Sequence, residues 1–134
     1  MKLAQRILVI EDEHVLAQNV KSYLGRRFPD VRIAADGRRA MEISASFLPD
    51  VVVLDYNLPG ENGLQIYKEM VRQRAGPISC VMITGYPLEK ITESANKLGI
   101  RHLLSKPFSL SELQQLIDQS ADEASGDSQS CVYN

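Results

Sequence analysis

The sequence predicts an α/β fold in which helices cover both faces of a single parallel sheet. Short apolar runs recur along the chain, and stretches with helical period separate them. This alternation is typical of βα units, which build parallel sheets. At 134 residues the chain has the length of one domain, so one sheet and one site are expected.

Five strands are expected, at residues 7–10, 31–35, 51–54, 78–83 and 103–105. Four of these runs lead directly into residues able to bind metal or phosphate, namely Glu11 and Asp12, Asp55, Thr84, and Lys106. The carboxyl ends of parallel strands lie along one edge, where open α/β sheets bind ligands. We therefore expect carboxylates, a hydroxyl and an ammonium to meet there.

Apolar residues at helical spacing predict a helix after each strand. The first helix, which must end before Pro29, has a face formed by Val15, Leu16, Asn19, Val20, Tyr23 and Leu24. The second lies between the turn pair Asp36-Gly37 and Pro49, with a stripe of Ala40, Ile43, Ser44 and Phe47. A loop over residues 59–63 leads to the third, for which Asn62 is the expected N-cap ahead of Leu64, Tyr67, Met70 and Val71.

The last two helices carry their own end signals. Gly99 is expected as a left-handed cap after the stripe of Leu88, Ile91, Ala95 and Leu98. Ser109 and Glu112 have the spacing of a capping box ahead of Leu113, Leu116 and Ile117. The domain is expected over residues 1–122, followed by a frayed polar tail over residues 123–134.

Right-handed crossovers between these units predict a doubly wound sheet with the flavodoxin-like strand order 2-1-3-4-5. The first and third strands are neighbours in that order. The acidic pair then faces Asp55 across a crevice, and Thr84 and Lys106 arrive from the fourth and fifth strands.

Composition argues against several classes of function. A net charge of -2 gives no overall attraction to nucleic acid or to an anionic membrane. The first apolar run is too short for a signal peptide, and no run approaches the ~20 residues of a membrane span. Cys80 and Cys131 have no metal-type spacing and are expected to be reduced thiols, so a cytoplasmic location is expected.

Three carboxylates in one crevice repel one another unless some protonate or a cation binds. Oxygen ligands without His or Cys favour Mg²⁺ or Mn²⁺. Asp55, central on the edge, is the best candidate for a nucleophile toward phosphorus. Lys106 and the Thr84 hydroxyl would contact phosphoryl oxygens, and metal and lysine together would lower the pKa values of the acids.

Over residues 5–122 these motifs resemble the receiver domain of two-component response regulators. Glu11 and Asp12 look like its acidic pair, Asp55 its phosphoacceptor, and Asn57 the residue whose backbone carbonyl completes the Mg²⁺ shell. Thr84 resembles its switch hydroxyl, and Lys106-Pro107-Phe108 its lysine motif, with a cis bond before the proline.

The resemblance implies phosphoryl transfer to Asp55 from a sensor histidine kinase, a phosphotransfer protein or a small phosphodonor. A population shift would then change the face of helix 4, strand 5 and helix 5. Partners implied are an effector protein or fused output domain, and a phosphorylation-dependent homodimer. Self-phosphorylation and slow self-dephosphorylation are implied, not turnover of an outside substrate.

Near Thr84, one position departs from the family's motif, and another is expected to modulate the site. Leu103 stands where the family usually has a mobile aromatic residue. The resemblance therefore implies phosphorylation of Asp55, but it does not extend to the family's usual coupling between the switch hydroxyl, here Thr84, and an aromatic side chain. His102 precedes Leu103 in the strand and should point to the opposite face of the sheet. Both His102 and His14 are expected to lie at the surface. Tyr86 is expected to modulate access to the phosphoryl group.

Two other classes of function stay open. One is a degenerate receiver that only docks partners, against which the set of Asp12, Asp55, Thr84 and Lys106 argues. The other is an enzyme. An aspartate-nucleophile phosphohydrolase normally has a second Asp where this chain has Asn57, and a nucleotide hydrolase would need a G-x-x-x-x-G-K-[ST] loop, which the sequence lacks.

Overall fold

The computed structural model describes residues 4–74 and 78–125, and its main sheet confirms the predicted architecture. Five parallel strands are arranged in the order β2-β1-β3-β6-β7. Counted along the chain as the five strands of this sheet, that is the predicted order 2-1-3-4-5. The strands are β1 (Arg6–Ile10), β2 (Asp30–Ala34), β3 (Val51–Asp55), β6 (Ser79–Thr84) and β7 (His102–Ser105).

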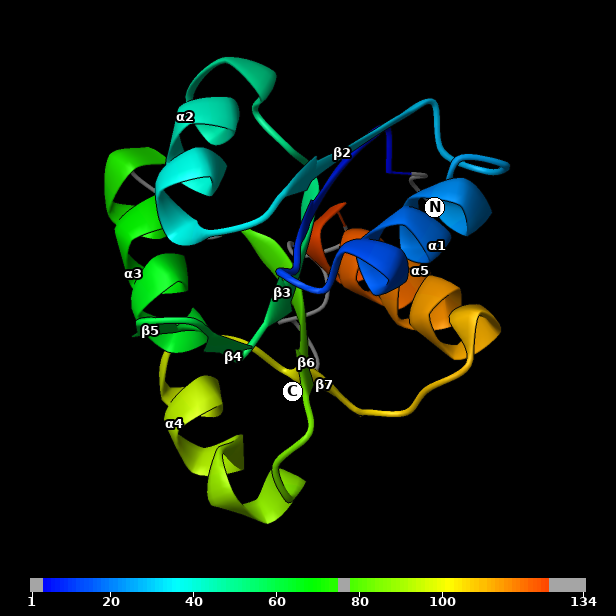
Figure 1. Cartoon of the computed structure of the whole chain (residues 1–134). Helices are drawn as coiled ribbons and strands as arrows, with labels where there is room; N and C mark the ends of the chain where they lie inside the picture. The colour runs from blue at the N-terminus through cyan, green and yellow to red at the C-terminus, as the bar shows by residue number, and fades with distance from the viewer. Residues whose placement is uncertain (1–3, 75–77, 126–134) are drawn as a thin grey trace.

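Helices cover both faces of this sheet (Figure 1). On one face lie α1 (His14–Leu24) and α5 (Leu110–Ser125). On the other lie α2 (Gly37–Phe47), α3 (Gly63–Arg74) and α4 (Thr92–Lys97). Because both faces are covered, the central strands are apolar at consecutive positions rather than at alternate ones. In β3, Val52 and Leu54 pack toward the α2–α3–α4 face, while Val51 and Val53 pack toward α1 and α5.

The buried face of α1 differs from the predicted one. Ala17, Val20 and Leu24 are buried, but Val15 is 71% exposed and Asn19 is also exposed. The stripe that faces the sheet follows the spacing i, i+3 and i+7, and Val15 falls outside it. The prediction was right for Leu16, Val20, Tyr23 and Leu24, which pack against the core. It was wrong for Val15 and Asn19, because the sequence does not show how the helix is rotated against the sheet.

The loop expected over residues 59–63 contains a short antiparallel ribbon. Strands β4 (Asn57–Leu58) and β5 (Glu61–Asn62) pair with each other and turn at Gly60, whose φ is +78°. The side-chain oxygen of Asn62 accepts a hydrogen bond from Gln65 N at 3.1 Å, which confirms it as the cap of α3. Two-residue strands have too little periodicity to be predicted.

The last helices keep their predicted signals with one change. The fourth begins as a 3₁₀ turn, η1 (Leu88–Lys90), before α4, and Gly99 has the expected positive φ of 92°. Glu112 N donates to Ser109 Oγ at 3.0 Å and Ser109 N donates to Glu112 Oε1 at 3.3 Å, which is the predicted capping box. Helix α5 runs to Ser125, so residues 123–125 of the predicted tail are helical, and residues 126–134 lie outside the described part.

The cysteines and the lengths of the helices can be compared with the predictions. Cys80 is a free thiol buried within β6, and its burial raises the pKa of the thiol. Cys131 lies outside the described residues. Within residues 4–74 and 78–125, no helix is both long enough and apolar enough to cross a lipid bilayer.

Candidate functional site

Four strands deliver the predicted site residues to one edge of the sheet. Glu11 and Asp12 follow β1, Asp55 ends β3, Thr84 ends β6, and Lys106 follows β7. The register brings the strand ends level, since Ile10 pairs with Leu54, Asp55 with Ile83, and Thr84 with Ser105. The convergence that the sequence predicted from strand ends is therefore present in the structure.

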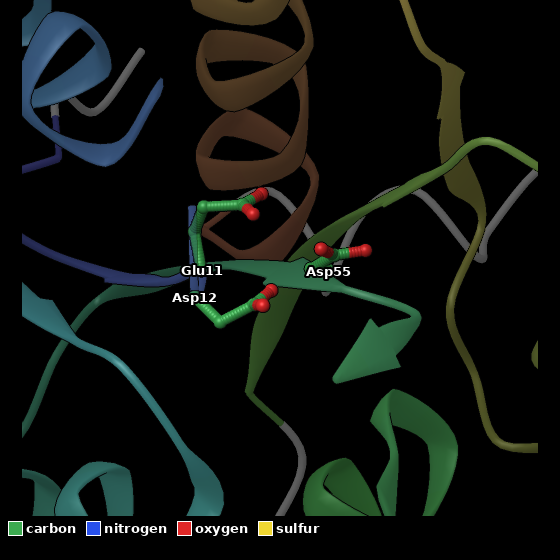
Figure 2. A group of neighbouring side chains, drawn as sticks. All are labelled: Glu11, Asp12 and Asp55. Atoms are coloured by element: carbon green, nitrogen blue, oxygen red, sulfur yellow. The ribbon is translucent and has the colours of Figure 1, made fainter. Parts of the chain in front are cut away.

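Three carboxylates form an acidic cluster, which we define as Glu11, Asp12 and Asp55 (Figure 2). One oxygen of each lies within 4.8 Å of the others. Glu11 and Asp55 are each 3% exposed, whereas Asp12 is exposed. A group of carboxylate oxygens with one side open to solvent suits a hard divalent cation that keeps some of its water.

Lys106 contacts the two buried carboxylates of this cluster. Its Nζ lies 3.1 Å from Asp55 Oδ2 and 3.2 Å from Glu11 Oε1, and the bond to Pro107 is cis, as expected. Burial disfavours the charged lysine, but the hydrogen bond to Asp55 and the charges of Asp55 and Glu11 outweigh it, so the pKa of Lys106 is raised. The ammonium therefore stays protonated at neutral pH, next to two carboxylates.

Glu11 has a raised pKa with Lys106 as the nearby cation, whereas the prediction of lowered pKa values concerned a metal and the lysine acting together. Burial, reinforced by the charge of Asp55, raises the pKa of Glu11 to about 7, although a hydrogen bond from Glu13 N and the nearby Lys106 oppose the change. Its Oε1 is buried and forms an ion pair with Lys106 at 3.2 Å, but no geometrically ideal hydrogen bond. A buried carboxylate beside two other carboxylates fits a bound cation.

The second oxygen of Asp55 is held by the β4–β5 ribbon. Asn57 N donates to Asp55 Oδ1 at 3.0 Å, and Asn57 Oδ1 accepts a hydrogen bond from Thr84 Oγ1 at 3.4 Å. The Thr84 hydroxyl also accepts from Tyr86 N at 2.9 Å. Thr84 is fully buried, so these contacts connect its hydroxyl to the acidic cluster without direct contact with Asp55.

The residues expected to modulate or transmit a signal lie around this centre. Tyr86 is 52% exposed, and its ring centroid lies 5.8 Å from that of Tyr56. Leu103 is half-buried and packs toward α4, on the opposite side of β7 from His102, as predicted. The expectation that His102 lies at the surface is wrong, because its side chain is only 12% exposed and contacts Glu123 of α5 at 2.9 Å; His14 is exposed, as expected.

One residue near the site was not singled out from the sequence. The carboxylate of Glu61, in β5, accepts a hydrogen bond from Gly37 N at the start of α2 at 2.9 Å. The two residues are 24 positions apart, and no spacing rule connects them. An acidic residue beside Asn62 in a loop has the ordinary meaning of a solvated turn residue, so the sequence carried no usable signal for this contact.

The family model of the response regulator receiver domain matches residues 7–118, which include every residue of this edge. The chain belongs to this family. The receiver domain is the part of two-component systems that carries the signal, generally without catalytic turnover. Members bind Mg²⁺ through acidic residues, and the acidic cluster here has the composition to do so.

Known relatives agree with this assignment. The transcriptional regulatory protein PdtaR of Mycobacterium tuberculosis is 30% identical over 115 residues, which are 85% of this chain and 55% of PdtaR. The chain thus spans about half the length of the curated relative it matches.

Solved structures share the fold of this receiver domain. A CheY-like receiver domain protein from Methanospirillum hungatei superposes with a TM-score of 0.83 at 21% identity, covering 93% of this chain and 99% of that one. A response regulator from Burkholderia pseudomallei, described with a phosphorylated aspartic acid, calcium ion and citrate, gives 0.78 at 22% identity over 92% of this chain and 72% of that one.

Proposed function

We propose that this receiver domain is a phosphorylation-dependent switch in which Asp55 accepts a phosphoryl group. The observation that carries the proposal is the environment of Asp55. Its carboxylate is buried at a strand end, with Lys106 on one oxygen and Asn57 N on the other, inside an acidic cluster. A buried aspartate beside a cation, here the Lys106 ammonium, is suited to attack an electrophilic phosphorus.

In the proposed reaction an oxygen of Asp55 forms a bond to phosphorus while the bond from phosphorus to the donor breaks. The leaving group, the nitrogen of a phosphohistidine or the acyl oxygen of acetyl phosphate, keeps the electron pair. The metal would be held by Glu11, Asp12, Asp55 and the backbone carbonyl of Asn57, where it would neutralise charge on the transferring group.

Lys106 and Thr84 would respond to the new group. Lys106 now contacts Asp55 Oδ2, and a phosphoryl oxygen would compete for the same ammonium. The Thr84 hydroxyl would leave Asn57 Oδ1, at 3.4 Å the longer of its two hydrogen bonds, to donate to another phosphoryl oxygen. The phosphorylated protein of Burkholderia pseudomallei supports this chemistry on the same fold.

The consequence we propose is altered partner binding at the face of α4, β7 and α5. Leu103 lies in β7 and packs toward α4, so a movement of Thr84 in the neighbouring strand β6 has a route to this face. The donor would be a sensor histidine kinase or phosphotransfer protein. The receiver would act through an effector protein, a fused output domain or its own dimer, in the cytoplasm.

The test is intact-protein mass spectrometry after incubation with acetyl phosphate, with and without Mg²⁺. We expect one phosphoryl adduct that requires Mg²⁺ and is absent from Asp55→Asn. No adduct in wild type under either condition would overturn the proposal and favour a domain that only docks partners. An adduct that persists in Asp55→Asn would place the phosphoacceptor elsewhere.

A further inference from the structure

The β4–β5 ribbon controls where Asn57 lies. Asn57 N contacts Asp55 Oδ1, its side chain contacts the Thr84 hydroxyl, and under the proposed function its carbonyl faces the metal. Yet the ribbon pairs only Asn57 with Asn62 and Leu58 with Glu61. A two-stranded ribbon is marginally stable at best by itself, so contacts outside the ribbon must fix its position.

Leu58 supplies one of these contacts. Its side chain is 6% exposed and belongs to the core on the α2–α3–α4 face. Apolar contact is non-directional, so it does not by itself set the orientation of the ribbon. Next to the two ends of the ribbon, Tyr56 N donates to Ile83 O and Gly63 N donates to Tyr56 O, both at 2.8 Å. A directional contact made by a residue of β5 itself would add to these bonds.

Glu61 supplies a directional contact from β5 to α2. Its carboxylate accepts a hydrogen bond at 2.9 Å from Gly37 N, the first residue of α2. The first N–H groups of a helix have no partner within it, and the helix dipole favours negative charge at this end. Asp36 caps Arg39 N at 2.8 Å, so Glu61 takes a different free N–H of the same helix.

The fit around this carboxylate is close. A Cβ placed on Gly37 would lie 2.5 Å from Glu61 Oε1, so a larger residue there would push the carboxylate away. A Cβ on Gly63, the first residue of α3 directly after β5, would lie 2.7 Å from the backbone oxygen of Asp55. The chain that leaves the ribbon therefore lies close against the end of β3.

We propose that Glu61 is a positioning residue for the metal and phosphoryl site. By tethering β5 to the start of α2, it sets the orientation of β4 and so places Asn57 against Asp55 and Thr84. The proposal rests on the proposed function, because it assigns Glu61 a role in the same Mg²⁺-dependent reaction. Glu61 is not a member of the acidic cluster, and its carboxylate contacts Gly37 N.

The experiment measures the Mg²⁺ dissociation constant by amide NMR, and the phosphorylation rate by acetyl phosphate as Mg²⁺ is varied, in the full chain. Loss of a residue that orients a metal ligand typically weakens metal binding by at least about tenfold. We expect Glu61→Ala to raise both the dissociation constant and the half-saturating Mg²⁺ by about that factor. The limiting rate at saturating Mg²⁺ should change little, because Asp55, Thr84 and Lys106 are intact.

Three further variants separate positioning from a general loss of structure. Glu61→Gln keeps an oxygen acceptor and should restore most of the affinity. Gly37→Ala should weaken Mg²⁺ binding with Glu61 intact, and combining it with Glu61→Ala should cost no more than Glu61→Ala alone. Glu69→Ala, which removes a carboxylate that pairs with Arg72 on α3, should bind Mg²⁺ like wild type.

The outcomes distinguish this inference from the proposed function. If wild type binds Mg²⁺ and is phosphorylated while Glu61→Ala stays within twofold of it, the positioning role is overturned and the proposed function stands. The role is also overturned if Glu69→Ala weakens Mg²⁺ binding as much as Glu61→Ala. If wild type neither binds Mg²⁺ nor accepts phosphate, the proposed function fails, and the positioning role fails with it.

Discussion

At the scale of single residues, Glu11 has the most unusual environment of the acidic cluster. Its carboxyl group is buried beside Asp55, and one of its oxygens has no hydrogen bond. Burial and the charge of Asp55 disfavour the charged form, so the pKa of Glu11 rises from 4.5 to about 7. The same conditions make Glu11 available as a ligand when a cation arrives.

Without divalent cations, this carboxyl should make stability depend on pH. The folded protein holds the Glu11 proton more tightly than the unfolded chain, so its contribution is complete below pH 4.5 and is lost as pH rises to about 7. The loss amounts to as much as about 3 kcal/mol. Glu11→Gln, which cannot ionise, should show a smaller decline. Urea unfolding of both proteins at pH 5 and pH 8 in EDTA provides the measurement.

The comparison between the two proteins matters because other groups also titrate over this range. Only the difference between wild type and Glu11→Gln reports on Glu11. Curves of stability against pH that run parallel in the two proteins would contradict the raised pKa. A decline that is steeper in Glu11→Gln would reverse the sign of the argument.

At the scale of elements, the segment after β6 links the Thr84 hydroxyl to the surface. Tyr86 N donates to Thr84 Oγ1, and the Tyr86 ring lies beside that of Tyr56, which follows Asp55. Two tyrosines from different strand ends thus meet near Asp55, the proposed phosphoacceptor. Because half of Tyr86 is exposed, its ring would have room to move under the proposed movement of Thr84.

Replacing Tyr86 by alanine should shorten the lifetime of phosphorylated Asp55. Removing the ring opens this side of the site to water, which hydrolyses the acyl phosphate. Since the ring is partly exposed, we expect a change of less than about tenfold, or about 1.4 kcal/mol in the barrier. Loss of the adduct over time, followed by mass spectrometry after acetyl phosphate is removed, gives the rate.

Tyr86→Phe is the matched control, because it keeps the ring and removes only the hydroxyl. Its lifetime should be close to that of wild type if the ring acts by covering the site. Equal lifetimes for wild type and Tyr86→Ala would remove Tyr86 from the list of modulating residues.

At the scale of the whole molecule, the site connects strands that are distant in the sequence. The acidic cluster joins the end of β1 to the end of β3, and Lys106 adds the end of β7. A cation bound at the cluster would therefore hold together parts of the sheet that separate on unfolding. A ligand that binds only the folded state stabilises it according to its concentration.

Mg²⁺ should accordingly raise the free energy of unfolding of the entire domain. At a hundredfold excess over the dissociation constant the gain is about 2.7 kcal/mol. Urea unfolding with MgCl₂, compared with NaCl of equal ionic strength, measures it. Asp12→Asn should lose most of the gain, because Asp12 is the exposed carboxylate of the cluster. A gain of the same size in NaCl or in Asp12→Asn would speak against a specific site.

The sequence by itself determined the sheet, its strand order and the identity of the residues at its edge. These features are local in the chain, because each apolar run and the polar residue that ends it are adjacent. Parallel strands connected by right-handed crossovers then leave few possible arrangements. Asp55, Thr84 and Lys106 could therefore be placed together before any coordinates were known.

Only the tertiary structure decided which face of α1 packs against the sheet, where the β4–β5 ribbon lies, and the direction in which the pKa of Glu11 is shifted. Exposure of Val15 depends on the rotation of a helix against the sheet, and the contact from Glu61 to Gly37 joins segments 24 residues apart. The raised pKa of Glu11 results from burial and from the charge of Asp55, a residue far away in the sequence. Such properties belong to contacts between elements, and no local pattern of residues encodes them.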